Sequence, residues 1–264
     1  MRGGIRGRRG GVGGRRRRRA HRRRATRASR SSSGILLEHA HGSVEGDALL
    51  VATGRRADVD GLGLEEAGIP LRDGFVPIDE RCRTAVEHVF AAGDVNGGRL
   101  YTHVAAHEGT VAGLNAAGRR ARLDEHAVPE VVFTDPELAR VGTSVGDVSV
   151  VSFPMERVDR ARIRHRPQGF VTLVTAPRRL LRRIGGGRLV GATIVGDRAG
   201  ELIHECALTI QTGAFAGRLA QTIHAYPTMS LAVQQAAAQL FPLGRLLVES
   251  GEEEKRTRPV THRT

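Results

Sequence analysis

The sequence predicts an α/β segment followed by an α+β domain, and two observations lead to this expectation. The run Ala48–Ala52 (ALLVA) is continuously apolar, which is typical of a parallel strand that is buried on both faces. Beyond residue 128, strand-like patterns come first and two helix-like patterns follow, an order that indicates an α+β domain. A polar linker at 119–127 separates the two parts.

The first part is expected to contain several short strands and one long helix. The helix is predicted because Ala105, Val111 and Leu114 give it an apolar face and Gly118 ends it. The expected elements, in chain order, are strands at Ile35–Glu38 and Ala48–Ala52, a turn with a short helix at Gly61–Gly68, strands at Phe75–Ile78 and Val86–Ala91, and the helix at His103–Ala117.

The second part is expected to place four strands before two helices. Ile203, Ala207 and Ile210 are spaced so that they share one face of the first helix. The expected elements are strands at Glu130–Phe133, Val148–Phe153, Gly169–Thr175 and Arg188–Val195, then helices at Ala199–Thr212 and Met229–Leu240.

The positive charge of the chain is concentrated at its start. The formal net charge is +13, from 41 Lys and Arg against 28 Asp and Glu, yet residues 1–33 hold 14 Arg and no acidic residue. The rest of the chain therefore has a net charge of −1. We expect 1–33 to be a disordered Arg/Gly-rich tail, and 244–264 a second disordered tail, because neither holds enough apolar surface to fold.

A nucleic-acid partner is expected only for the tail at 1–33, and only through non-specific phosphate contacts. The tail has no interleaved aromatic residues on which bases could stack. Its composition is also compatible with a targeting segment, or with an out-of-frame translation that replaces a missing front half. Of these three possibilities, the out-of-frame translation is favoured.

Several other classes of protein are disfavoured by composition. No run of 18 apolar residues exists, so no membrane span is expected, and the start is not a secretory signal. Cys82 and Cys206 lack the CxxC and CxxxxC spacings, which favours two reduced, buried thiols in a cytoplasmic protein. No metal site is expected, because His103 and His107 have no further ligand beside them.

The segment Thr84–Asp94 (TAVEHVFAAGD) carries the strongest chemical signal. Gly93 would let a ligand approach the backbone, and the Asp94 carboxylate can accept a hydrogen bond from a sugar-like hydroxyl. Backbone N–H groups at the helix start near His103 can face a ligand oxygen. A Gly-Asp pair by itself is usually only a turn, so the surrounding motifs decide its interpretation.

Those motifs resemble the second half of the FAD-dependent pyridine nucleotide–disulfide oxidoreductases, a family that includes dihydrolipoamide dehydrogenase and mercuric reductase. Several long motifs occur in the family's order. They are VATGRRADVDGLGLEEAGI (Val51–Ile69), GFVPIDERCRTAVEHVFAAGDV (Gly74–Val95), THVAAHEGTVAGLNAAG (Thr102–Gly118), VVFTDPELARVG (Val131–Gly142), GRLVGATIVGDRAGELI (Gly187–Ile203) and HAYPTMS (His224–Ser230).

The resemblance implies a fold class, namely an α/β remnant of FAD/NAD(P)-binding domains at 34–120 followed by an α+β dimerisation domain at 128–243. It implies FAD and NAD(P) as cofactors and a homodimer as the assembly.

The same resemblance assigns roles to individual residues. Asp94 would bind the flavin ribityl chain, with Gly93 giving access to the backbone. The helix start at His103, Val104 and Ala105 would lie near the flavin ring. Thr53 and Gly54 belong to the segment that closes the NAD(P)-binding domain.

The chain also departs from the family pattern. It has no GxGxxG phosphate loop and no CxxxxC disulfide. Tyr226 stands where disulfide-reducing members carry a catalytic His, and Leu231 stands where they carry the partner Glu. Tyrosine, with a pKa near ~10, is a poor base at neutral pH. Mercuric reductases carry a Tyr here, but their terminal Cys pair is absent, so we expect no mercury chemistry.

The function expected from these observations is that of an FAD-dependent pyridine nucleotide oxidoreductase, present as a truncated C-terminal fragment that is inactive alone. Tyr226 would act across the dimer interface. The alternatives are a non-catalytic homodimerisation module and nucleic-acid binding through the tail. His224 is expected to be structural or to lie at an interface, and Glu201 and Glu205 to form a solvated helix face.

Overall fold

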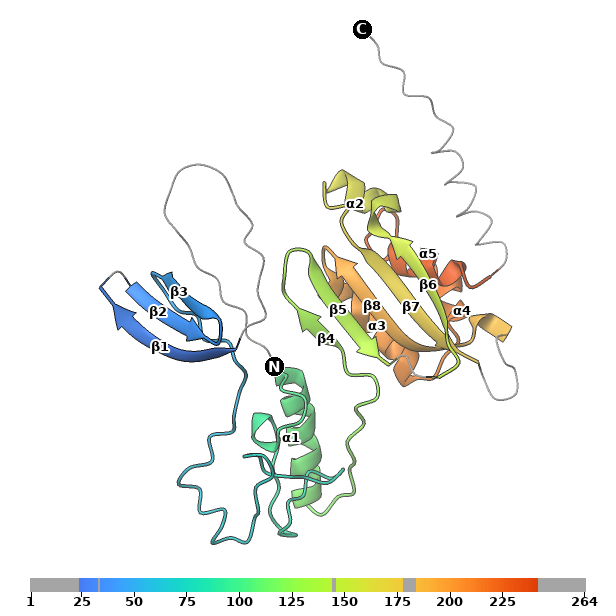
Figure 1. Ribbon diagram of the computed structural model, residues 1–264. Helices are drawn as coiled ribbons and strands as arrows, with labels where there is room; N and C mark the ends of the chain where they lie inside the picture. The colour runs from blue at the N-terminus through green and yellow to red at the C-terminus, as the bar shows by residue number, and fades with distance from the viewer. Residues whose placement is uncertain (1–23, 33, 144–145, 178–183, 242–264) are drawn as a thin grey trace. The chain divides into compact units, whose positions relative to one another are not determined.

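The computed structural model describes residues 24–32, 34–143, 146–177 and 184–241 (Figure 1). The chain divides into two compact units, 1–123 and 124–264, and the division falls inside the expected linker. The tail at 244–264 and most of the Arg-rich start lie outside the described residues. The phosphate-binding role of the start therefore stays a prediction.

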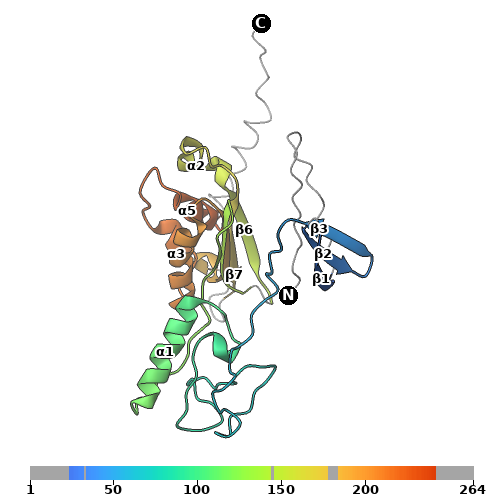
Figure 2. The same ribbon diagram turned by 90° about the vertical axis from the view of Figure 1, so that its left-hand side faces the viewer.

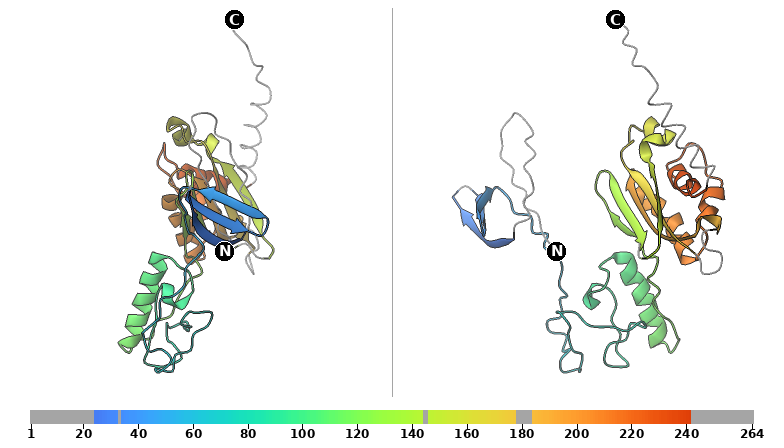
Figure 3. Two further views of the ribbon diagram at one scale, coloured as in Figure 1. Left: turned by 60° about the vertical axis from the view of Figure 1, so that its left-hand side comes forward. Right: turned by 45° about the vertical axis from the view of Figure 1, so that its right-hand side comes forward.

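The first unit opens with a three-stranded antiparallel sheet in the order β1–β2–β3 (Figure 3). Its strands are β1 (Ala25–Ser31), β2 (Gly34–His39) and β3 (Gly42–Gly46). The strand expected at Ile35–Glu38 is confirmed, because β2 pairs with a neighbour on both sides.

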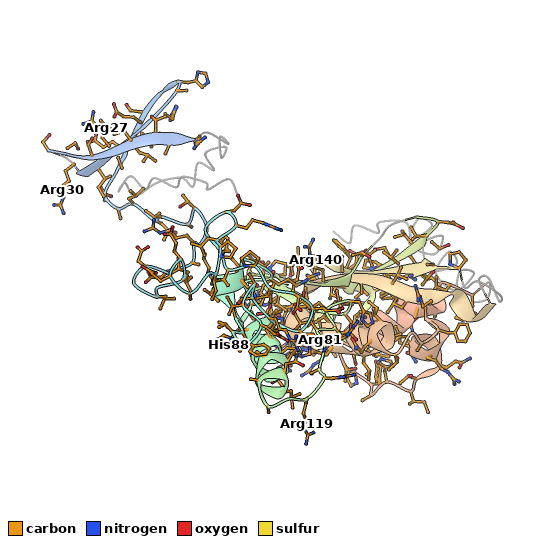
Figure 4. All side chains as sticks on the ribbon, turned by 90° about the horizontal axis from the view of Figure 1, so that it is seen from below. Arg27, Arg30, Arg81, His88, Arg119 and Arg140 are labelled. Atoms are coloured by element: carbon orange, nitrogen blue, oxygen red, sulfur yellow. The ribbon has the colours of Figure 1, made fainter. Side chains whose placement is uncertain are left out.

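The expectation of disorder is wrong for Ala25–Ser31. This segment has little apolar surface, but β2 offers it a backbone ladder that is regular from Arg27 to Ser31, and backbone pairing does not require apolar side chains. Thr26 Oγ1 also donates to the carbonyl oxygen of Glu38 at 3.2 Å. Arg27 and Arg30 extend from this strand (Figure 4).

The buried parallel strand expected at Ala48–Ala52 is not formed. This segment has no regular structure, and the side chains of Leu50 and Val51 are 86% and 69% exposed. In the part of the chain that the structure describes, both sheets are entirely antiparallel, so no parallel neighbour pairs with it. An apolar run becomes a buried strand only where such a neighbour exists.

Other expected elements of the first unit are reduced to turns and bridges. Phe75–Ile78 and Val86–Ala91 form only the isolated bridges Arg72↔Phe75 and Arg83↔Phe90. Gly61–Gly68 is a series of turns without a helix. Hydrogen bonds between residues a few positions apart close these turns, and the N–H of Val76 also donates to the more distant Val95 carbonyl oxygen at 2.9 Å.

The expected helix is confirmed as α1 (Thr102–Ala116), and the loops of the first unit are joined to it (Figure 2). Asn115, buried near its end, donates from Nδ2 to the carbonyl oxygens of Arg81 and Ala121, and its Oδ1 accepts from the Ala121 N–H, each at 3.0 Å. The Cys82 thiol donates to the Glu108 carbonyl oxygen at 3.4 Å. These bonds order a region that contains little regular structure.

The second unit is an α+β domain, as expected. Its antiparallel sheet has the order β4–β5–β8–β7–β6, and helices cover one face of it (Figure 2). The strands are β4 (Glu130–Val132), β5 (Glu137–Gly142), β6 (Ser149–Pro154), β7 (Phe170–Ala176) and β8 (Arg188–Gly196). The α-helices are α2 (Asp159–Ile163), α3 (Ala199–Gln211), α4 (Gly217–Gln221) and α5 (Leu231–Ala238).

Strand β5 and helices α2 and α4 were not expected from the sequence. The alternation of apolar and polar residues in β5 is short, and it includes a charged residue, Arg140. Arg140 Nε donates to Glu130 Oε2 on β4 at 2.5 Å. Both helices have only five residues, too few to show a helical period. No helix in the described part of the chain is long and apolar enough to cross a membrane.

The core of the second unit is aliphatic and lies between the sheet and the helices. Leu173 on β7, Ile194 on β8, and Ile203 on α3 are fully buried in one cluster with residues of α5. Close strand packing also requires a glycine at position 169, because a Cβ there would lie 1.9 Å from the Val195 carbonyl oxygen. Burial of aliphatic surface therefore stabilises this unit without any tryptophan.

Replacing Leu173 by Ala should lower the free energy of unfolding of the second unit by about 2–5 kcal/mol, because it leaves a cavity in a closely packed core. Val150→Ala, at an exposed position on β6, is the matched control and should change it by less than about 0.5 kcal/mol. Chemical denaturation followed by circular dichroism measures both. Equal effects of the two substitutions would contradict this account of the core.

Candidate functional site

The expected ligand-binding residues of the first unit meet where the chain turns before α1. Gly93 has a φ of 86° and precedes the short 3-10 helix η1 (Asp94–Asn96). A Cβ at Gly93 would lie 3.2 Å from the Cβ of Ala105, one helical turn into α1. Glycine is needed here for both its positive φ and this close approach.

A buried carboxylate holds this turn against the helix. Glu108, on α1, accepts hydrogen bonds at Oε2 from the Gly93 N–H at 2.5 Å and from Asn96 Nδ2 at 2.8 Å. Hydrogen bonds to a charged group are stronger than those between neutral groups. Glu108 therefore fixes the position of the neighbouring Asp94 relative to the start of α1.

The sequence interpretation missed both Glu108 and Asn96. A signal for Glu108 was present, because it lies on the buried face of α1 with Val104, Val111 and Asn115. An acidic residue at an apolar position of a helix is unusual and indicates a polar partner.

Asp94 itself is half exposed and is paired with an arginine that follows the Thr53-Gly54 segment. Arg55 Nη1 donates to Asp94 Oδ2 at 2.8 Å and to the Leu100 carbonyl oxygen at 3.0 Å. This arginine brings Thr53 and Gly54, both exposed, to the site. Because an exposed ion pair contributes at most about 1 kcal/mol, a ligand hydroxyl can compete for the carboxylate.

The start of α1 presents backbone and one exposed ring. The N–H groups of Val104 and Ala105 donate to the Tyr101 carbonyl oxygen at 3.1 and 3.0 Å. The Val104 side chain is buried and belongs to the core, whereas His103 is exposed and its ring stacks on Tyr101, with 5.3 Å between the ring centroids. The positive end of the helix dipole lies at this end of α1.

Tyr226 lies in the second unit, in the loop between α4 and α5. Its side chain is 72% exposed, and its hydroxyl donates to Oδ2 of Asp159, the first residue of α2, at 2.8 Å. The bond to Asp159 and the negative charge of that carboxylate raise the pKa of Tyr226. The phenol therefore stays protonated at neutral pH, so even less phenolate is present to act as a base than in a free tyrosine.

One expectation about α3 is wrong. Glu201 is exposed, as expected, but Glu205 is not part of a solvated face, because its Oε2 lies 3.0 Å from His224 Nε2 and the carboxylate is largely buried. Because the two glutamates are four residues apart on one helix, the sequence predicts the same exposed face for both. In the structure the loop after α4 covers Glu205 and leaves Glu201 exposed.

Both thiols are buried, as expected. Burial, with a smaller contribution from the charge of Glu205, raises the pKa of the Cys206 thiol, so neither reactivity nor metal binding is favoured there. Among the described residues, no group of three or more His, Cys, Asp and Glu side chains could hold a metal ion.

Two family models match the chain. Residues 18–109 match the pyridine nucleotide-disulphide oxidoreductase model, and residues 128–237 match the model of the dimerisation domain of the same family. The chain belongs to the pyridine nucleotide-disulphide oxidoreductase family. It consists of part of the nucleotide-binding region followed by the dimerisation domain.

Curated relatives and solved structures agree with this assignment. The chain is 37% identical to dihydrolipoyl dehydrogenase of Bacillus subtilis over 203 residues. This aligned region covers 74% of this chain and 42% of the relative. It is also 37% identical to dihydrolipoyl dehydrogenase 3 of Haloarcula marismortui over 211 residues, and that aligned region covers 76% of this chain and 43% of the relative. The chain thus spans less than half the length of these relatives.

Among solved structures, LpdA from Mycobacterium tuberculosis superposes with a TM-score of 0.75 at 31% identity, over 83% of this chain and 49% of that one. The flavoprotein disulfide reductase RclA from Escherichia coli gives a TM-score of 0.72 at 25% identity, over 82% of this chain and 51% of that one. The mercuric-reductase-like character of the Tyr226 segment stays a prediction.

Replacing Glu108 by Ala should destabilise the first unit by about 1–3 kcal/mol, because the Gly93 N–H and the Asn96 amide lose their buried acceptor. Glu87→Ala is the matched control, since Glu87 is exposed and pairs only with Arg83 at 3.7 Å. Hydrogen exchange of the Gly93 amide provides a local measurement. Unchanged protection in Glu108→Ala would contradict the anchoring role of this carboxylate.

Proposed function

We propose that this chain forms the flavin-facing and dimer-forming parts of an FAD-dependent pyridine nucleotide oxidoreductase. In such an enzyme NAD(P)H reduces FAD, and FAD reduces a disulfide or another acceptor. The observation that carries the proposal is the turn at Gly93-Asp94, which Glu108 fixes against the start of α1. The family membership of the chain supports it.

The residues at this turn fit the sugar-like part of a flavin. Asp94 offers a half-exposed carboxylate that can accept hydrogen bonds from ribityl hydroxyls, and Gly93 lacks the Cβ that would fill the space beside Ala105. The exposed Thr53-Gly54 segment is joined to the same turn through Arg55. His103 and the backbone of Val104 and Ala105 would face the flavin ring. FAD, when bound, would accept the hydride and pass on the electrons.

We further propose that the 264-residue chain does not turn over by itself. The GxGxxG loops that cradle pyrophosphate and the CxxxxC pair that accepts electrons do not occur in it. The second candidate function, a non-catalytic homodimerisation module, is favoured by the match to the dimerisation domain over 128–237. The two functions differ in whether the chain retains affinity for flavin.

Titration of the chain with FAD, followed by quenching of flavin fluorescence, should reveal weak binding without NAD(P)H oxidation. Asp94→Asn should weaken the binding about tenfold, the equivalent of about 1.4 kcal/mol, because the neutral amide accepts ribityl hydrogen bonds less well. Asp58→Asn, at an exposed position, is the control. Equal affinity in the two variants would exclude Asp94 as a flavin ligand. If neither the unsubstituted chain nor either variant binds FAD, the non-catalytic homodimerisation module is the function that remains.

The chain should be a homodimer in solution, as measured by size-exclusion chromatography with light scattering. Ile223, beside the Tyr226 segment, is 95% exposed against 59% for Val150, and it lies in the region that matches the family's dimerisation domain. Ile223→Lys should therefore shift the equilibrium toward monomer, whereas Val150→Lys on β6 should not. A dimer that tolerates Ile223→Lys would place the interface elsewhere.

A further inference from the structure

The loop between α4 and α5 carries Tyr226, and a histidine two positions earlier fastens this loop to α3. The His224 side chain is only 6% exposed. Its Nε2 lies 3.0 Å from Glu205 Oε2, and its Nδ1 lies 2.9 Å from the Thr222 carbonyl oxygen. Gln234, on α5, donates to the same carbonyl oxygen at 2.9 Å, so this oxygen is a shared acceptor.

Both ring nitrogens of His224 thus face oxygen atoms, and this arrangement determines how many protons the pair must hold. A neutral imidazole has one N–H donor and one acceptor nitrogen. If Glu205 were ionised and His224 neutral, a ring lone pair would face either the Glu205 carboxylate or the Thr222 carbonyl oxygen. One of the two contacts would then be lost.

One additional proton satisfies both contacts. It can reside on the imidazole, which then donates from both nitrogens, or on the carboxyl, which then donates to Nε2. Because the two sites are coupled, the proton belongs to the pair rather than to either residue. We propose that Glu205 and His224 hold this single proton between them, and that the proton keeps the Tyr226 loop fastened to α3.

The surroundings of the pair favour retention of the proton. Burial raises the pKa of the Glu205 carboxyl, while the hydrogen bond and charge of His224 oppose this effect. Glu205 Oε1 is buried without a partner, which further disfavours a negative charge there. A raised pKa means that the folded chain binds the proton more tightly than the unfolded chain, so this contribution to stability is present at low pH and falls as the pH rises.

The other titratable groups near the pair do not replace the proton. On α3, Cys206 is buried and neutral, and Glu201 lies one turn earlier with its carbonyl oxygen 3.3 Å from His204 Nδ1. From α4, the backbone carbonyl oxygen of Arg218 accepts from the N–H and the hydroxyl of Thr222. Within the described part of the chain, no other charged side chain pairs with Glu205 or His224.

Loss of the proton should release the loop, and Tyr226 with it. Tyr226 donates to Asp159 at 2.8 Å, and a carboxylate that accepts from a phenol quenches its fluorescence. The chain has no Trp and only two Tyr. In a Tyr101→Phe background, Tyr226 is therefore the only strong fluorophore, and its emission reports the position of the loop.

The test is a scan of Tyr226 emission upward from pH 4.5, the ordinary pKa of a glutamic acid, to about pH 9, which stays below the ordinary pKa of tyrosine. The full chain with Tyr101→Phe should show one transition that involves a single proton, with stronger emission at high pH. Glu201→Gln, one turn away on the same helix, is the matched control and should leave the transition unchanged.

The decisive variant is Glu205→Gln. The glutamine amide can donate to Nε2 of a neutral His224 while Nδ1–H donates to Thr222, so the loop should stay fastened and the transition should disappear. His224→Gln cannot make both contacts and should show the high-pH emission at every pH.

If Glu205→Gln retains the transition, or shows the high-pH emission throughout, the proton is not what fastens the loop. Absence of a transition in the unsubstituted pair would also overturn the proposal, and circular dichroism verifies that each variant is folded.

Discussion

The organisation of the first unit depends on one buried carboxylate. Glu108 comes from α1, and it is the acceptor for both the Gly93 N–H and the Asn96 amide. The loops around it have little regular structure, so they have few ladder hydrogen bonds of their own. A polar group in a core is costly unless its partners are complete. Here the completeness of those partners gives a loop-rich region one defined conformation.

The second unit is held together by a different kind of constraint. Its strands and helices exclude water from an aliphatic cluster, and the partly buried pair of Glu205 and His224 joins α3 to a loop. Nonpolar packing is insensitive to pH, whereas a buried acid–base pair is not. The unit therefore combines a core that is robust to pH with a loop attachment that depends on it.

The parts of the fold that sequence could predict were those stabilised by residues close together in the chain. Helix α3 has its own apolar face, and strands β6, β7 and β8 have their own alternation. Helix α1 formed where predicted, but its expected apolar face is wrong, because Leu114 is exposed and the buried face includes Glu108 and Asn115. Ala25–Ser31 became a strand only because β2 offers it an edge, and Ala48–Ala52 failed to become one because no neighbour is available. Neither outcome could be read from the segment itself. The motif at Gly93-Asp94 was visible, but Arg55 and Glu108 contact it from 38 residues before and 15 residues after Gly93.

The exposed run Leu49–Val51 has a consequence for how the chain survives in a cell. A short, apolar, β-prone segment without a partner is a site for self-association and for chaperone capture. Its flanks oppose this tendency, because Asp47 precedes the run and the consecutive Arg55 and Arg56 follow it. Charged residues at the ends of such a segment act as gatekeepers that slow cross-β assembly. The solubility of the chain therefore depends on the charges beside this run as well as on the stability of its folded units.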